Sequence, residues 1–199
     1  SSAASDVYKR QGLIGAALFA WFLVRQQRSA SPLMPLSLFR VRDFAWGNLA
    51  TLFVYAALSL NGFVVGVYLQ QGAGLSATAA GLASLPMTIL MILISSRAGS
   101  WAGRFGPRIF MTVGPLVMAV GALMLLVVSE DFDYWWQVLP AMIVLGLGLS
   151  LTVAPLTSAI LGAIDESRSG IASAVNNAVS RVAGPVSYTH LTLPTSDLV

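Results

Sequence analysis

The stretch F-A-W-G-N-L-A-T-L-F-V-Y-A-A-L-S-L-N-G-F-V-V-G-V-Y-L, residues 44–69, contains no charged side chain and is rich in Leu, Val, Phe and Ala. A helix needs about 20 predominantly apolar residues to cross the hydrocarbon core of a bilayer. The stretch is long enough for this, and it therefore predicts a transmembrane helix.

The composition of the whole chain agrees with this prediction. The chain has 199 residues, of which 56% are hydrophobic and 10% charged, and its mean hydropathy is +0.78. Soluble domains contain about 25% charged residues, so the composition excludes an ordinary water-soluble globule. The sequence has no cysteine, which excludes disulfides and cysteine nucleophiles. Its arginines are scattered, so they do not form the basic cluster that would indicate a nucleic-acid partner.

Further apolar stretches on both sides of this one follow the same pattern. We expect an all-α, polytopic transmembrane fold of about six segments, with the first and last truncated and the lipid bilayer as solvent. The expected segments are residues 12–24, 44–69, 77–101, 109–128, 135–164 and 170–184. Prolines at 86, 115, 140 and 155 lie within or at the ends of these segments, where they permit bends.

Arginine is present in every second gap between the segments. The first, third and fifth gaps contain it, at Arg25, Arg28, Arg40 and Arg42, at Arg97, Arg104 and Arg108, and at Arg168. The second gap is uncharged, and the fourth is acidic, with aromatic residues at 134–136 of the kind found at membrane interfaces. Because arginine accumulates on the cytoplasmic side of membrane proteins, we predict that the first, third and fifth gaps are cytoplasmic.

The first gap also contains a break followed by an amphipathic piece. Pro32 and Pro35 interrupt any helix there, and Phe39 and Phe44 then follow with Arg40 and Arg42. We expect this piece to lie on the membrane surface.

The two ends of the chain are related to each other as DNA. Residues 6–11, D-V-Y-K-R-Q, can be encoded by a sequence whose reverse complement, read one frame over, encodes V-S-Y-T-H, which is the sequence of residues 186–190. The flanking bases also fit Pro185 and Leu191. Both ends resemble read-through of a transposon-end sequencing adapter, so we interpret residues 1–11 and 185–199 as adapter-derived scars and exclude them from the fold.

Polar residues recur on one face of the second segment. Asn48, Thr51, Tyr55, Ser59, Gly62 and Gly66 follow one another at spacings of three and four, which places them on one side of a helix. A polar group in hydrocarbon needs a partner. This face therefore either packs against another helix, with Gly62 and Gly66 as a close-packing pair, or lines a wet cavity.

The sixth segment repeats the theme, with Asn177 and Arg181 one helical turn apart. An arginine within a bilayer span is a functional candidate unless it has a structural partner, and the sequence leaves both alternatives open. The candidate residues for a substrate cavity are Asn48, Thr51, Tyr55, Asn61, Asn176, Asn177 and Arg181.

Acidic residues are absent from the segments. Every Asp and Glu between residues 12 and 184 falls in a gap, and the only histidine, His190, lies in the excluded end. An intramembrane protease or metalloenzyme needs such side chains as bases or ligands. We therefore predict no catalytic residue, no metal site and no enzyme.

Five motifs resemble the C-terminal part of bacterial multidrug exporters of the fourteen-helix drug:proton antiporter family, in the major facilitator superfamily. The resemblance covers essentially all of residues 12–184. The motifs are P-L-M-P-L-S-L-F-R-V-R-D-F (32–44), V-Y-L-Q-Q-G-A-G-L-S-A-T-A-A-G-L-A-S-L-P (67–86), A-G-S-W-A-G-R-F-G-P-R (98–108), A-P-L-T-S-A-I (154–160) and S-G-I-A-S-A-V-N-N-A-V-S-R-V-A-G (169–184).

The resemblance implies that the six segments are helices eight to thirteen of a transporter in the bacterial cytoplasmic (inner) membrane. The 98–108 motif looks like the second-half copy of the superfamily's cytoplasmic loop motif, matched at Gly99, Arg104, Gly106 and Arg108. The aspartate usual in that motif is replaced here by Gly103, which puts a charge-relay latch in doubt. Arg104 is then either the partner of a helix C-terminus or a plain topology anchor.

The implied function is proton-coupled efflux of drugs or other amphipathic compounds by alternating access. The family's proton-carrying acid belongs to the N-terminal half, which is the missing partner of this part of the chain, and the proton gradient takes the place of a cofactor. Two alternatives stay open. One is a major facilitator exporter of a metabolite, siderophore or amino acid, and the other is a polytopic scaffold or membrane enzyme that does not transport.

Overall fold

A computed structural model describes residues 2–29, 34–127 and 132–192, and its side chains over 10–15, 17–29, 34–126 and 132–186. Every regular element in these ranges is helical. In chain order they are α1 (Ser2–Arg28), η1 (Leu36–Arg40), α2 (Arg42–Val67), η2 (Tyr68–Gly72), α3 (Ala77–Ala83), α4 (Leu85–Phe105), α5 (Pro107–Met124), η3 (Leu125–Val127), η4 (Tyr134–Val138), α6 (Leu139–Gly162), η5 (Glu166–Arg168) and α7 (Ser169–Thr192).

Four helical stretches in the described residues are long and apolar enough to cross a membrane. They are Arg42–Gly72, Ala77–Phe105, Pro107–Met124 and Tyr134–Gly162. They correspond to the second to fifth predicted segments, while α1 and α7 contain the first and sixth. The all-helical fold predicted from the sequence is therefore confirmed.

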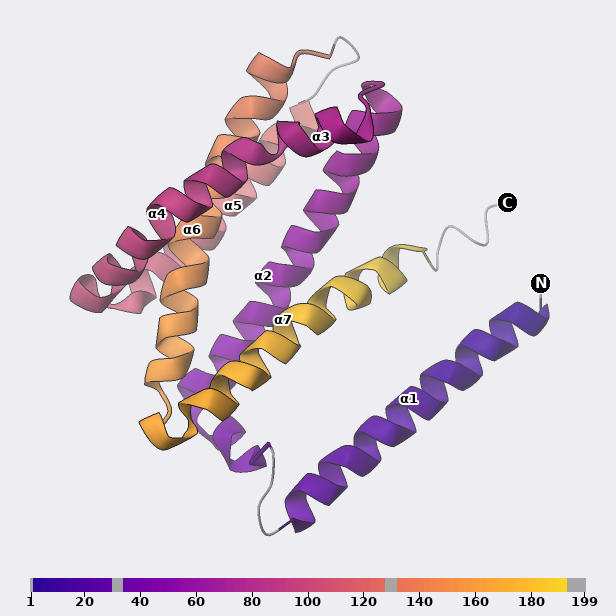
Figure 1. The fold of residues 1–199 in the computed structure, drawn as a ribbon, viewed down its shortest axis with the longest axis vertical. Helices are drawn as coiled ribbons and strands as arrows, with labels where there is room; N and C mark the ends of the chain where they lie inside the picture. The colour runs from indigo at the N-terminus through magenta and orange to yellow at the C-terminus, as the bar shows by residue number, and fades with distance from the viewer. Residues whose placement is uncertain (1, 30–33, 128–131, 193–199) are drawn as a thin grey trace.

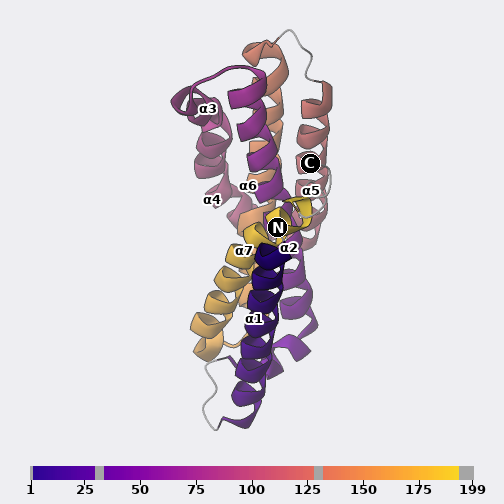
Figure 2. The same ribbon diagram turned by 90° about the vertical axis from the view of Figure 1, so that its right-hand side faces the viewer.

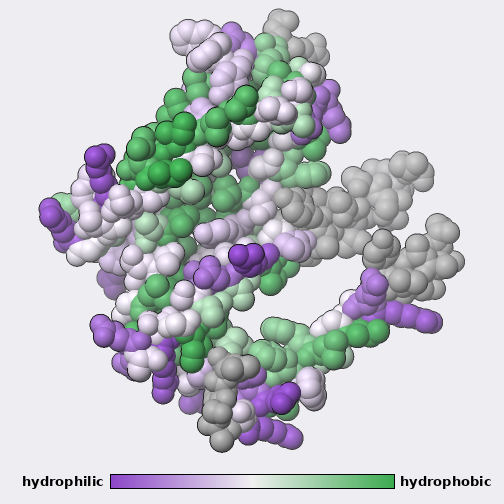
Figure 3. All heavy atoms as spheres, viewed as in Figure 1, coloured by the Kyte–Doolittle hydropathy of each residue, from purple (hydrophilic) through white to green (hydrophobic). Residues whose placement is uncertain are grey.

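The helices run alternately up and down, and this arrangement separates the arginine-bearing gaps from the other two. Figure 1 shows the α1–α2 and α6–α7 connections at the lower end of the molecule, the α4–α5 connection at its left side, and the α2–α3 and α5–α6 connections at the upper end. Figure 2 shows the same division from the side. Hydrophobic side chains gather over α4 between the two ends (Figure 3). The geometry agrees with the orientation predicted from the arginines.

The upper end has the exposed aromatic residues expected at a membrane interface. The side chains of Trp135 and Trp136 are 70% and 82% exposed. The Asp133 carboxylate accepts hydrogen bonds from the backbone N–H groups of both tryptophans, at 2.8 and 3.4 Å. These hydrogen bonds cap the start of η4. Glu130 and Asp131 of the same acidic gap lie outside the described residues, as does Pro32 in the first gap.

The third predicted segment is not one helix. Residues 77–101 were predicted as one membrane segment in which Pro86 permits a bend. In the structure α3 ends at Ala83, Ser84 interrupts the helix, and α4 begins at Leu85 with Pro86 in its first turn. A proline has no N–H to donate to the preceding turn, and its ring clashes with that turn's carbonyl, so the helix breaks just before Pro86. Pro115 and Pro155, by contrast, lie inside α5 and α6 without ending them.

The first and last helices are longer than predicted. Helix α1 begins at Ser2, and the backbone of α7 stays helical through Pro185 to Thr192, although the sequence analysis ended the sixth segment at Gly184. Residues 186–192 contain neither glycine nor proline, so nothing in them ends a helix. The origin of the two ends stays a prediction. The side chains of Lys9 and His190, and all of residues 193–199, lie outside the described part.

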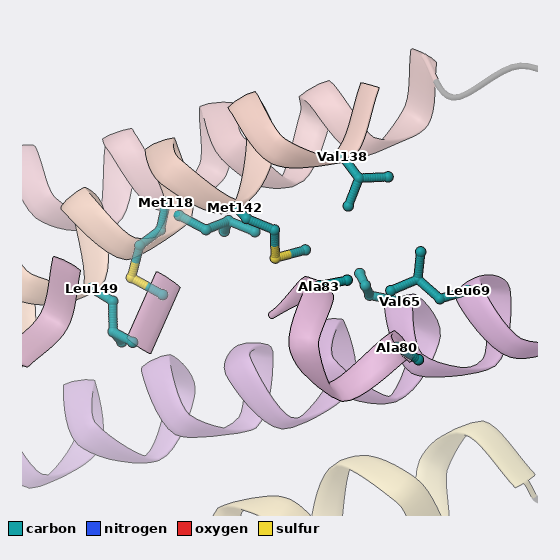
Figure 4. Packing of buried hydrophobic residues seen from close by; sticks show 9 residues of the cluster. Val65, Leu69, Ala80, Ala83, Met118, Val138, Met142 and Leu149 are labelled. Carbon is teal, nitrogen blue, oxygen red and sulfur yellow. The ribbon is translucent and has the colours of Figure 1, made fainter. Parts of the chain in front are cut away.

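Two apolar clusters join the helices. The first, toward the upper end, includes Val65, Ala83, Met118, Met142 and Leu149 from α2, α3, α5 and α6 (Figure 4). The second, toward the arginine-bearing end, joins η1, α2, α6 and α7 through Leu38, Phe44, Leu156, Ile160, Ala172 and Val175. Helices α2 and α6 both contribute to the two clusters, and α6 is the central helix of the packing because it has more buried residues than α2.

Helix α6 comes very close to its neighbours at glycines. A Cβ atom added to Gly148 would lie 2.5 Å from the backbone nitrogen of Met118 in α5, and one added to Gly146 would lie 2.9 Å from the Cα of Met87 in α4. Small residues allow membrane helices to approach in this way, which maximises van der Waals contact where the hydrophobic effect is absent.

The glycine pair predicted to pack, Gly62 and Gly66, does not do so within the described residues. No atom lies within 4 Å of a Cβ built on either glycine. Close packing at this pair stays a prediction, because spacing alone does not say which helix face meets a neighbour and the chain spans about a third of the length of its relatives. On α2 the close approach is at Gly47, where an added Cβ would overlap the Ile160 side chain of α6.

Replacing Gly148 by alanine is expected to destabilise the protein, because the added methyl group meets backbone atoms that cannot turn aside. Overpacking of this kind typically costs about 1–3 kcal/mol, while alanine gains only about 1 kcal/mol over glycine in a helix. Thermal unfolding of the intact protein in detergent measures the difference. Gly81→Ala is the matched control, because no atom lies within 4 Å of its Cβ position. Equal melting temperatures for the two variants would contradict the packing argument.

Candidate functional site

Three of the predicted cavity residues form a buried polar cluster where α2 meets α7. The Asn176 amide nitrogen donates to the Thr51 hydroxyl at 2.9 Å and to the Asn48 side-chain oxygen at 3.3 Å. Asn48 and Thr51 are only 3% and 2% exposed, and Asn176 is 9% exposed. Asn176 is more than 120 positions away from Asn48 and Thr51 in sequence, so the cluster holds two distant helices side by side.

The polar side chains of α2 in this cluster also form hydrogen bonds within α2. The Asn48 amide nitrogen donates to the Phe44 carbonyl at 2.9 Å, and the Thr51 hydroxyl donates to the Gly47 carbonyl at 3.0 Å. A buried polar group loses its hydrogen bonds to water and is costly unless it finds a partner, and here each has one. The sequence left open whether this polar face packs against another helix or lines a wet cavity. At Asn48 and Thr51 the described residues show packing against another helix.

Asn177 and Arg181 lie on the other side of α7. Both side chains are exposed, whereas Ala172, Asn176 and Ala183 are buried. At 100° per residue, Arg181 is about half a turn around the helix from Asn176 and Ala183. The structure thus separates these two candidates from Asn48 and Thr51. Tyr55 lies on α2, one helical turn beyond Thr51, and is half-buried.

Asn61 lines an apolar pocket of about 270 Å³ between α2, α5 and α6. Its other lining residues are Phe53, Val54, Ala57, Leu58, Pro115, Met118, Ala119, Ala122 and Leu145. A mostly apolar pocket with one amide is suited to a hydrophobic molecule that carries a hydrogen-bonding group. Sequence analysis identified only Asn61, because the remaining lining residues do not differ in type from lipid-facing ones.

The cytoplasmic loop motif forms a tight turn between α4 and α5. Gly106 is the single residue that joins them, and its φ of 86° lies in the left-handed region that favours glycine. Arg104 and Arg108 are exposed in the last turn of α4 and the first turn of α5. Arg104 thus lies at a helix C-terminus, where the helix dipole favours a cation. Gly99 of α4 faces Ala154 of α6 at ordinary van der Waals distance: a Cβ added to Gly99 would lie 3.6 Å from the Ala154 Cβ.

The family follows from comparison with known proteins. A model of the Major Facilitator Superfamily matches residues 11–188. The chain belongs to the major facilitator superfamily. The match covers every helix that contributes to the two apolar clusters, the polar cluster and the pocket, and the protein is accordingly a multi-pass membrane protein.

Several bacterial members of the superfamily are similar in sequence to this chain. The multidrug efflux pump LfrA of Mycolicibacterium smegmatis is 31% identical over 88% of the chain and 34% of its own length. The tetracenomycin C resistance and export protein of Streptomyces glaucescens is 32% identical over 87% of the chain and 32% of its own length. The multidrug resistance protein Stp of Mycobacterium tuberculosis is 28% identical over 88% of the chain and 32% of its own length. The chain thus spans about a third of the length of these relatives.

The polar cluster can be tested by a double-mutant cycle. We expect Asn48→Leu and Asn176→Leu each to lower the free energy of unfolding by about 1–2 kcal/mol, because each leaves a partner without its hydrogen bond. The double variant should lose less than the sum, by about 1 kcal/mol, because it removes both groups together. Thermal or denaturant unfolding in detergent measures all three. Strictly additive losses would show that the two amides do not interact.

Proposed function

We propose that the intact protein exports hydrophobic or cationic drugs across the bacterial cytoplasmic (inner) membrane in exchange for protons, by alternating access. Membership of the superfamily and the arrangement of the membrane-crossing helices support a transporter. The relatives that contain matching segments bear the names of a multidrug efflux pump and of resistance and export proteins. These names support export as the direction of transport.

The observation that carries the drug-export proposal is the apolar pocket beside Asn61. Its walls consist of aliphatic and aromatic side chains together with Met118, whose flexible thioether adapts to ligands of different shape. A pocket of about 270 Å³ holds part of a drug-sized molecule and not all of it. The remainder of the binding surface would come from the two-thirds of the transporter outside this chain.

A second candidate function is export of an antibiotic that the producing bacterium makes itself. Two relatives favour it by name, the cephamycin export protein of Amycolatopsis lactamdurans, 28% identical, and the probable actinorhodin transporter of Streptomyces coelicolor, 28% identical. Both candidates use the same scaffold and direction of transport. They differ in whether the natural substrate is an imported toxin or a product of the cell.

Cellular accumulation of fluorescent hydrophobic cations tests the proposal. Cells that express the intact gene should accumulate several-fold less compound than cells with an empty vector, and collapse of the proton gradient with a protonophore should abolish the difference. A panel of neutral and anionic antibiotics run in parallel separates the second candidate. Unchanged accumulation of every compound, despite good expression in the membrane, would overturn drug export.

The role of the pocket is tested by filling it. Ala119→Trp should reduce export of bulky substrates by tenfold or more, because the indole occupies space that Ala119 and Met118 leave open. Val120→Trp is the matched control on the same helix, since Val120 is 53% exposed and does not line the pocket. Transport rates at equal expression are compared. Equal rates for both variants would show that the pocket takes no part in substrate binding.

A further inference from the structure

Contacts between α7 and α2 place Arg181 at a definite level along α2, which the sequence leaves open. Helices α2 and α7 run side by side in the same direction (Figure 1). Asn176 contacts Thr51, and eight residues later a Cβ on Gly184 would lie 3.3 Å from the Ser59 hydroxyl. Arg181 lies between these two contacts and is therefore about level with residues 55 and 56 of α2.

That level is the middle of a membrane span. The span Arg42–Gly72 has 31 residues, so its central residue is Ala57. The edge of the hydrocarbon core is about 15 Å away in either direction, or about ten residues of helix. Snorkelling to the headgroups is effective near helix ends, not at this depth. An arginine here therefore needs a counter-charge or a water-filled cavity.

Among the acidic residues whose side chains the structure describes, none can supply the counter-charge. Asp43, Asp133, Asp165 and Glu166 lie at helix ends or in turns. The helix face that carries Arg181 is opposite the one that packs on α2. The described side chains of this chain therefore offer no partner, and the chain spans about a third of the length of its relatives.

We infer that Arg181 forms an ion pair with a carboxylate on a membrane helix in the remaining part of the transporter, and that the Asn177–Arg181 face of α7 is the surface on which this helix docks. Charge complementarity favours a protein carboxylate over an anionic substrate. A substrate leaves in every transport cycle, and its departure would leave the arginine without a counter-charge. A fixed side chain neutralises it in the empty transporter as well.

Substitution of Arg181 by a neutral residue in the intact transporter tests the ion pair. Arg181→Gln should lower the melting temperature by several degrees, whereas Arg181→Lys should retain most of the stability because it keeps the charge. Each Asp or Glu within a span of the remaining sequence is then neutralised in the Arg181→Gln background. The double variant that removes the true partner should recover the loss, since no charge is left unpaired. Arg168→Gln, in an exposed turn, is the control and should leave the melting temperature unchanged.

Cross-linking provides a second readout that is independent of folding losses and of the compound exported. This chain has no native cysteine, so Asn177→Cys adds a single thiol to it. It should form a disulfide with a cysteine placed one turn from the identified acid.

Three outcomes would overturn the inference. Arg181→Gln could behave like the Arg168→Gln control, every acid could fail to restore stability, or Arg181→Gln could abolish binding of anionic compounds alone, which would identify a substrate as the partner. Recovery and cross-linking without drug export would instead leave the ion pair standing and remove the proposed function.

Discussion

A charged or unpaired polar group cannot rest in hydrocarbon, and the arrangement of this protein depends on that constraint. It confines the backbone to helices, whose hydrogen bonds are satisfied within each segment. It also places arginines at one end of the molecule and the described carboxylates at helix ends. Arg181 lies near the middle of α7, far from either end of that helix, which is why its surroundings in the intact protein matter.

Membrane-crossing helices and their orientation could be predicted from the sequence, because both depend on local properties. The length of an uncharged run and the arginine content of the next gap are visible without knowledge of neighbours. The break at Ser84 is also local, and Pro86 is its visible cause. The sequence could not show whether Pro86 only bends the helix or interrupts it, because prolines are also tolerated inside membrane helices, as Pro115 and Pro155 are in α5 and α6.

Contacts between helices could not be predicted in the same way. The polar stripe on α2 was recognised, but the partner of Thr51 lies 125 residues further along the chain. Similarly, Gly62 and Gly148 look alike in sequence, and only the second meets a neighbouring backbone. Of the candidate site, the sequence identified polar residues that stand out in an apolar background. It could not identify the apolar walls of the pocket beside Asn61, since the same residue types also face lipid.

The one-residue connection at Gly106 has a mechanical consequence. With no slack between α4 and α5, the arginine-bearing end of one cannot tilt without displacing the start of the other, and both are also wedged against α6 at glycines. These three helices therefore behave as one rigid unit, which meets α2 in both apolar clusters and α7 in the lower one. A displacement at the α4–α5 turn would then be passed to α6 and to the helices packed on it.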